Sequence, residues 1–496
     1  ALFFEDFKKQ RASQLQAFKN EQDRQFHSFL KKQWEEFNSF QGEPEDPAPK
    51  PDKIPTASEG LPTDVTKLTP EGRPDTTSEP EPGPEPEPEQ PAMPDLQSEP
   101  DTTPSPMPKP ETAPAEPEPR PVQKNLATVS VGILGHDLNI RVPREWGKAR
   151  ITSVDNDGIA DFWKSYAQWD VKPVARQLRQ KREALKLNDW GQVLLTRRFA
   201  HELMGNKQNE ATLLAWALLM DQGYDVRAGY TKEDVYIMYR AAQSVYDVTY
   251  FEIDGARYYL LSRPGDSGNS ASVADRKFYI HGELHADAER QVNLRFDHLP
   301  QAAKNTVKRE LSFDFQGKTY NFQTSINRNL IKHFKQIPQL DLDHYFATQP
   351  SSQLNAGLLP ELESAMTDMD LERKMTFLLR FAQTAFEYKT DDKQFGAENY
   401  LYPDETLFYS YSDCEDRAVL FSWLVRKLTD VRVVGLDYPG HVAAAVGDLD
   451  LGRGVSLEYE GANFVVTDPT YINAGPGIVL PKYKNEKPGI VPTSNL

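Results

Sequence analysis

Apolar residues in the first 42 positions of the chain recur with a period of eleven. They form four pairs, which are Phe4 and Phe7, Leu15 and Phe18, Phe26 and Phe29, and Phe37 and Phe40. Eleven residues fill three helical turns, so the pairs align in one narrow stripe of a helix predicted over residues 1–42. Such a stripe cannot bury itself, and we expect it to form a coiled coil or to bind a protein partner. A helix lying on a membrane surface, or docked on the protein's own body, is the alternative.

A second pattern covers residues 43–123, where proline and acidic residues dominate. Between Glu43 and Pro121 lie 24 of the chain's 38 prolines, with 19 Asp and Glu residues against 6 Lys and Arg residues. A stretch almost free of aromatic residues cannot bury enough apolar surface to offset the entropy lost on ordering. We therefore predict a disordered acidic linker that proline and like-charge repulsion extend.

From residue 124 onward, the pattern is that of an ordinary folded protein. Segments of period two around Gly135–His136 and Gln316–Lys318 predict two β-hairpins. Helical periodicity runs through residues 168–203 and 371–388, and strands follow each helical stretch. We predict an α+β fold, with a domain at 124–270, a β-rich module at 271–350 and a second domain at 351–496.

Charge and length narrow the classes of partner. The formal net charge is -17, and most of it belongs to the Pro-rich linker. The folded part is only mildly acidic, which excludes nucleic acid as the main partner. The sequence contains no run of about 18 apolar residues, so we predict no transmembrane helix. The chain begins at Ala1 without a Met, from which we expect a bacterial protein exported to the periplasm or cell envelope. We expect neither a cofactor nor a metal.

The chain has one cysteine, Cys414, so it can form no intramolecular disulfide. Cys414 opens an apolar helical segment that Ser412 or Asp413 can cap, and the helix macrodipole at that position lowers the pKa of a thiol. His441 follows a Pro-Gly turn at the start of a predicted strand, and Asp468 ends a later strand. The three residue types supply a nucleophile, a base and a group that orients the base. Each residue alone is more often structural.

The order of these residues and their surroundings resemble the transglutaminase-like superfamily, whose papain-like core uses Cys, His and Asp in this order. The resemblance covers residues 355–475 and rests on Asp413-Cys-Glu-Asp416, Gly440-His-Val442 and Thr467-Asp-Pro469. It implies a bacterial transglutaminase-like cysteine peptidase with Cys414, His441 and Asp468 as catalytic residues. It also implies that Gln383, on the upstream stretch, helps form an oxyanion hole beside the backbone N–H of Cys414.

An earlier part of the chain repeats this arrangement without its chemistry. Residues 209–262 align with residues 416–468, with small length changes in the middle. In that register the three catalytic positions hold other residues: Lys207 for Cys414, Asp234 near His441, and Ser262 for Asp468. The repeat predicts a degenerate transglutaminase-like domain that performs no thiol chemistry. The alternative is two helix-and-strand units that are alike by chance.

Two functions remain open. The first is a thiol enzyme that acts on protein or peptide substrates through an acyl-enzyme at Cys414 and is tethered to an envelope assembly by residues 1–42. Hydrolysis is favoured over cross-linking, because water is abundant and nothing near His441 predicts a dry site for an amine. The alternative is a non-catalytic scaffold that uses transglutaminase-like folds as binding platforms.

Overall fold

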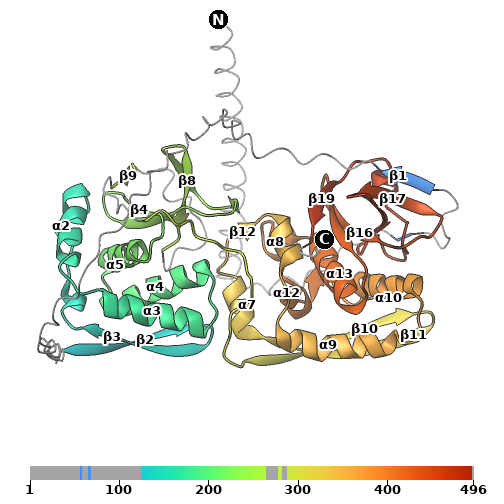
Figure 1. Ribbon diagram of the computed structural model, residues 1–496, viewed down its shortest axis with the longest axis horizontal. Coiled ribbons are helices and arrows are strands. Elements are labelled where there is room, and N and C mark those ends of the chain that lie inside the picture. The colour runs from blue at the N-terminus through green and yellow to red at the C-terminus, as the bar shows by residue number, and fades with distance from the viewer. Residues whose placement is uncertain (1–55, 58–64, 69–124, 264–276, 282–287, 494–496) are drawn as a thin grey trace, which may run out of the picture.

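The computed structural model describes residues 56–57, 65–68, 125–263, 277–281 and 288–493 (Figure 1). The helix predicted at 1–42 and most of the predicted linker lie outside these residues. The described chain combines helices and sheets in two lobes that lie side by side, which confirms the α+β class. No helix within the described ranges is long and apolar enough to cross a membrane.

The N-terminal lobe, as far as it is described, consists of a hairpin, a series of helices and a sheet. The hairpin is β2 (Leu126–Ile133) with β3 (His136–Pro143). The helices are η1 (Trp146–Lys148), α2 (Asn156–Tyr166), α3 (Lys172–Ala184), α4 (Asp189–Met204) and α5 (Gln208–Asp221). The strands, in the order of the sheet, are β7 (Tyr250–Ile253), β8 (Ala256–Leu261), β5 (Val235–Tyr239), β4 (Val226–Tyr230) and β9 (Tyr279–Ile280).

The C-terminal lobe follows the same plan. Its hairpin is β10 (Thr306–Phe315) with β11 (Lys318–Asn327). Its helices are α7 (Arg328–Phe334), α8 (Leu342–Ala347), α9 (Ser352–Ala365), α10 (Leu371–Thr384), α11 (Asp391–Gln394), α12 (Pro403–Phe408), α13 (Cys414–Leu428) and η2 (Pro481–Tyr483). Its sheet is ordered β1 (Val65–Leu68), β17 (Gly454–Tyr459), β18 (Ala462–Thr467), β16 (His441–Gly447), β15 (Val433–Tyr438) and β19 (Gly489–Pro492). Two short strands, β13 (Glu387–Tyr388) and β14 (Tyr411–Ser412), pair beside α13.

Both predicted hairpins are confirmed, and their turns explain why. Leu134 and Gly135 have φ angles of 52° and 77°, and Gln316 and Gly317 have φ angles of 50° and 76°. Two successive residues with positive φ form the turn whose twist matches that of a two-residue hairpin. A Cβ added at Gly317 would meet no atom within 4 Å, so this glycine is needed for its backbone angle and not for space.

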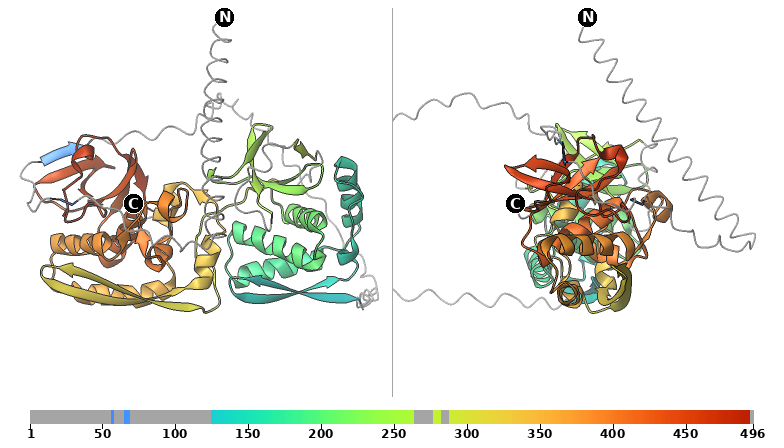
Figure 2. Two further views of the ribbon diagram at one scale, coloured as in Figure 1. Left: turned by 180° about the vertical axis from the view of Figure 1, so that it is seen from behind. Right: turned by 90° about the vertical axis from the view of Figure 1, so that its right-hand side faces the viewer.

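The coarse order of hairpin, helices and sheet is the same in the two lobes, although the C-terminal lobe has additional short helices and strands between its hairpin and its sheet. The sheet order β7-β8-β5-β4-β9 corresponds position for position to β17-β18-β16-β15-β19. Figure 2 shows both hairpins on one side of the molecule and both sheets on the other, with helices between them. The hairpin β10–β11 packs on α9 and α10 of its own lobe. The segment predicted as a separate module at 271–350 is therefore divided, because β9 belongs to the sheet of the N-terminal lobe and β10–β11 form the first layer of the C-terminal lobe.

A continuous hydrophobic core runs through both lobes. Helices α5 and α13 lie at its centre, since a continuous run of buried residues covers all faces of each helix. The lobes also meet through a short antiparallel pair, β6 (Val245–Tyr246) with β12 (Gln339–Leu340). An aromatic group around Phe296 and Tyr402 fills the junction.

One strand forms inside the predicted linker. Val65–Leu68 pairs in parallel with β17 at the edge of the C-terminal sheet, and Thr56 pairs with Ile472. The prediction of a disordered linker over 43–123 is therefore wrong for these residues. The physical reason is that β17 would otherwise present an unpaired edge, which a short extended segment can cover.

Candidate active site

Cys414 is the first residue of α13, as the sequence predicts. Asp413 precedes the helix in extended conformation, and its backbone N–H donates to Asp416 Oδ2 at 3.4 Å. A carboxylate three residues into a helix commonly satisfies the N–H of the residue before it in this way. The thiol is half-buried. Helix α13 packs against β16 (Figure 1), so the thiol lies near the start of that strand.

The structure brings the predicted base and its orienting acid together. His441 begins β16 and Asp468 directly follows β18, and these two strands are neighbours in the sheet. The distance between His441 Nε2 and Asp468 Oδ2 is 2.9 Å, and both side chains are buried. The other carboxylate oxygen accepts from the backbone N–H groups of Thr470 and Tyr471 at 2.9 and 3.1 Å. Asp468 is thus fixed on one side and holds the imidazole on the other.

The hydrogen bond of the Cys414 thiol goes to Glu415, and none joins its sulfur to the His441 ring among the described residues. The backbone N–H of Val442, the residue after His441, acts to lower the pKa of the Cys414 thiol. The imidazole ring stacks on Tyr483, with ring centres 5.0 Å apart and planes 13° apart. Because Nε2 faces Asp468, Nδ1 is the ring nitrogen left for another partner.

Gln383 is completely buried, but its amide does not serve the role expected for it. Its Nε2 donates to the backbone carbonyls of Asp468 and Ala474, at 3.0 Å each. Both amide hydrogens are therefore used, and none is left for an oxyanion at Cys414. These contacts assign Gln383 to holding the loop that carries Asp468.

The thiol pKa differs from the sequence expectation. Burial raises the pKa of the Cys414 thiol, and the carboxylates of Glu415 and Asp413 raise it further, while the N–H of Val442 acts in the opposite direction. The thiol also donates to Glu415 Oε2 at 3.0 Å. The expected lowering by the helix N-terminus is therefore outweighed, and the protonated thiol is favoured while those carboxylates stay uncompensated.

Five carboxylates gather beside Cys414, and we refer to them as the carboxylate cluster: Asp391, Glu398, Asp413, Glu415 and Asp416. Two overlapping groups, Asp391 with Asp413 and Asp416, and Asp391 with Glu398 and Glu415, each have oxygens within 4.8 Å of one another. All but Glu398 are buried. Burial, with the charge of Asp413, raises the pKa of Asp391 to about 8. Burial, with the charge of Glu415, raises the pKa of Asp413 to about 9.

The carboxylate cluster fits a divalent cation that prefers oxygen ligands. Asp413 Oδ1 and Glu415 Oε1 are buried and have no hydrogen-bond partner among the described residues. Buried carboxylates in this number require either bound protons or a positive charge. Calcium and magnesium are the ions that sets of carboxylate oxygens select. The sequence expectation of no metal did not consider this group of residues.

Arg417 is a buried positive charge that interacts with Asp413 and Asp416 of the cluster. Its guanidinium donates to Ser412 Oγ and to the backbone carbonyls of Gln383 and Phe386, at 3.0 to 3.1 Å. Burial lowers its pKa to about 10, so it remains charged at neutral pH. Arg417 ties the end of α10 to the start of α13 and compensates only part of the negative charge.

Comparison with known protein families, characterised proteins and solved structures finds no match for this chain.

The N-terminal lobe has different chemistry at the corresponding positions. Lys207 precedes α5, and its ammonium donates to the backbone carbonyl of Gly147. Asp234, just before β5, forms an ion pair with Arg263, just after β8. This ion pair joins the two strand ends that correspond to those joined by His441 and Asp468. Ser262 offers its backbone carbonyl to Arg197 at 2.7 Å. Neither a thiol nor an imidazole is present at these positions.

Sequence reasoning predicted a site at Cys414, His441 and Asp468 but did not predict a carboxylate cluster that includes Asp391 and Glu398. A signal was available in the run Asp413-Cys-Glu-Asp416, which places three carboxylates within two residues of the thiol. Carboxylates this close to the sulfur disfavour a thiolate. Their presence beside a predicted nucleophile therefore indicates that a positive charge outside this run compensates them.

Proposed function

We propose that this protein is a thiol hydrolase of protein or peptide substrates, with Cys414 as nucleophile, His441 as base and Asp468 as the residue that orients the base. The observation that carries the proposal is the buried 2.9 Å contact between His441 Nε2 and Asp468 Oδ2, at the start of the strand β16, against which the helix of Cys414 packs. A structural cysteine needs no oriented imidazole beside it.

The reaction follows from these positions. His441 Nδ1 takes the proton of Cys414, and the sulfur attacks the carbonyl carbon of the scissile peptide bond. His441 then gives this proton to the departing amine, which leaves an acyl-enzyme. Water attacks the acyl carbon while His441 takes one of its protons, and the sulfur departs as thiolate. His441 returns the proton to the sulfur, and the free acid leaves.

In this proposal the carboxylate cluster holds a divalent cation. The cation supplies positive charge that offsets Glu415 and Asp413, and these are the residues that raise the thiol pKa. The carboxylate cluster provides only oxygen ligands, and calcium prefers such ligands.

We further propose that the two lobes are tandem transglutaminase-like domains, of which the N-terminal one is silent. The shared strand order supports this view, as does the Asp234–Arg263 ion pair where a His–Asp pair would act. The expected export and tethering through residues 1–42 belong to the same proposal.

The test is a comparison of cleavage products. Envelope proteins are incubated with the full chain in the presence of calcium, and new N-termini are labelled and identified by mass spectrometry. We expect new termini with the wild type and with Lys207→Ala, and none with Cys414→Ser or His441→Ala. Incorporation of a fluorescent primary amine, without new termini, would instead indicate cross-linking. Identical termini in all four samples would overturn the proposal.

A non-catalytic scaffold is the second candidate, and one observation favours it. The thiol donates to Glu415, and the carboxylates around it favour its protonated form. A scaffold would give no new termini and no amine incorporation under any of these conditions.

A further inference from the structure

Two described pieces of the Pro-rich stretch lie on the C-terminal lobe. Val65–Leu68 forms β1 and pairs in parallel with Gly454–Leu457 of β17, at the edge of the sheet (Figure 1). Ahead of it, the backbone N–H of Ala57 donates to the carbonyl of Ile472 at 2.7 Å. Ala57 is 6% exposed, whereas its neighbour Thr56 is exposed. The segment is therefore bound to the C-terminal lobe through backbone hydrogen bonds and through the buried side chain of Ala57.

Ala57 contacts the loop that positions Asp468. It packs against Tyr471 and Ala474 in a small apolar cluster. The N–H of Tyr471 donates to Asp468 Oδ1, and the carbonyl of Ala474 accepts from Gln383. The residues that Ala57 touches are thus the ones that connect Asp468 to α10.

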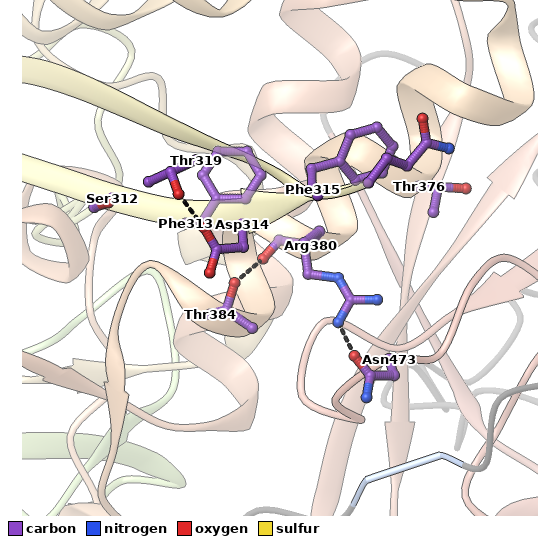
Figure 3. Close-up of a pocket in the computed structure, with 11 residues that line it drawn as sticks. Ser312, Phe313, Asp314, Phe315, Thr319, Thr376, Arg380, Thr384 and Asn473 are labelled. Atoms are coloured by element: carbon purple, nitrogen blue, oxygen red, sulfur yellow. Dashed lines mark hydrogen bonds between the residues drawn. The ribbon is translucent and has the colours of Figure 1, made fainter.

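The same loop is held from a third direction by Arg380. The guanidinium of Arg380, one turn before Gln383 on α10, donates to Asn473 Oδ1 (Figure 3). Arg380 and Asn473 line a cavity of about 710 Å³ that opens towards the β10–β11 turn and is separate from the thiol. Asn473 has a φ of 66°, in the left-handed region that asparagine adopts more readily than most other non-glycine residues. The loop thus depends on attachments outside itself.

We propose that the edge of β17 and the loop from Tyr471 to Ala474 form a binding site for an extended chain segment. The occupant is this chain's own residues 56–57 and 65–68, and their binding positions Asp468 towards His441. Addition of a strand at an open sheet edge is a recurring mode of peptide binding. Covalent connection gives the chain's own segment a high effective concentration over any competing strand.

Release of this segment from β17 would act on the loop that carries Asp468. In sequence, residues 56–57 and 65–68 lie between the predicted partner helix at 1–42 and both lobes. A partner that binds residues 1–42 and draws this segment off β17 would also release the loop at Asp468. The catalytic part of the inference rests on the proposed function, whereas the docking part does not.

The test compares Ala57→Glu with Thr56→Glu in the full chain. Both variants add one carboxylate to adjacent residues, but only the first puts it into the apolar cluster at Tyr471. Ala57→Gly, which keeps the backbone contact, serves as the conservative variant. Two quantities are measured: hydrogen–deuterium exchange over residues 468–474, and the rate of Cys414 alkylation by iodoacetamide with calcium present.

We expect Ala57→Glu to speed exchange over residues 468–474 and to slow alkylation by about fivefold or more, as is typical of energetic coupling between sites. Thr56→Glu and Ala57→Gly should match the wild type, and exchange in β5 of the other lobe should not change. Wild-type behaviour of Ala57→Glu in both measurements would overturn the inference. The inference would also be overturned if Ala57→Glu exchanged rapidly at residues 56–57 while exchange at residues 468–474 stayed at the wild-type rate. If wild-type Cys414 proves unreactive, the proposed function fails, but the exchange measurement still decides the docking.

Discussion

At Cys414, two effects with opposite signs compete for control of the thiol. A helix N-terminus stabilises a nearby negative charge by about 0.3–1 kcal/mol. A unit charge about 4 Å away contributes about 4 kcal/mol near a protein surface. Burial, followed by the charges of Glu415 and Asp413, therefore outweighs the helix N-terminus, and the thiol pKa rises. The sequence contains both carboxylates, but their burial depends on how residues 391–401 pack against α13, which no local pattern reveals.

Gln383 offers a direct test of its role in holding the Asp468 loop. Gln383→Glu should lower the free energy of unfolding by about 2–3 kcal/mol, because the carbonyls of Asp468 and Ala474 lose their donors and face a carboxylate. The measurement is urea unfolding followed by circular dichroism. Gln316→Glu makes the same chemical change at an exposed turn and should leave stability within about 0.5 kcal/mol. Full stability of Gln383→Glu, together with loss of activity, would return Gln383 to the oxyanion role.

His344 should make the protein sensitive to mild acid. Burial, with the charge of Arg295, lowers its pKa from 6.5 to about 3, and its Nε2 lies 2.8 Å from the hydroxyl of Tyr402. The unfolded chain binds a proton near pH 6.5 and the folded chain does not, so stability falls as the pH drops below 6.5. Between pH 7 and pH 5 this residue should cost about 2 kcal/mol.

The measurement is urea unfolding of the wild type and His344→Gln at both pH values. The variant keeps a partner for Tyr402 but cannot take up the proton, so it should lose about 2 kcal/mol less than the wild type on acidification. His298→Gln changes an exposed histidine and should behave as the wild type. An equal loss in all three proteins would show that His344 does not control the acid response.

At the scale of elements, local signals predicted that the candidate site residues lie at the ends of helices and strands. Asp413 caps the N-terminus of α13, so the helix begins at Cys414. The Pro439-Gly440 turn precedes β16, which begins at His441, and Asp468 directly follows β18. Strand β1 could not be predicted in this way, because its partner β17 lies far along the chain. The carboxylate cluster also depends on distant packing, since α11 and the segment after it approach α13 only in the folded lobe.

The carboxylate cluster predicts that calcium stabilises the protein. At a free calcium concentration about a hundred times the dissociation constant, the folded state should gain about 2–3 kcal/mol. Differential scanning fluorimetry with calcium, magnesium or a chelator measures the change in melting temperature. Asp391→Asn should abolish the shift, because Asp391 belongs to both groups of oxygens. Asp392→Asn changes the exposed neighbour and should retain it. A shift that is absent in the wild type, or equal in both variants, would contradict a cation site.

At the scale of the molecule, one arrangement of elements carries two different kinds of chemistry. The sheets of the two lobes match in strand order, but an Asp234–Arg263 ion pair joins the strand ends in one lobe and a His441–Asp468 contact joins them in the other. The sequence repeat predicted the correspondence of α5 with α13 and of the strands that follow. It did not reach back to the hairpins β2–β3 and β10–β11, because their residues have little in common and only their place in the fold is shared.

The central claim is that Cys414 is a nucleophile activated by His441. The most direct measurement is the second-order rate constant for alkylation of Cys414 by iodoacetamide at pH 7 with calcium present, followed by intact-protein mass. The account predicts that the wild type and Lys207→Ala react at the same rate, and about tenfold or more faster than His441→Ala. Equal, slow alkylation of all three proteins would contradict it and would make Cys414 a structural thiol.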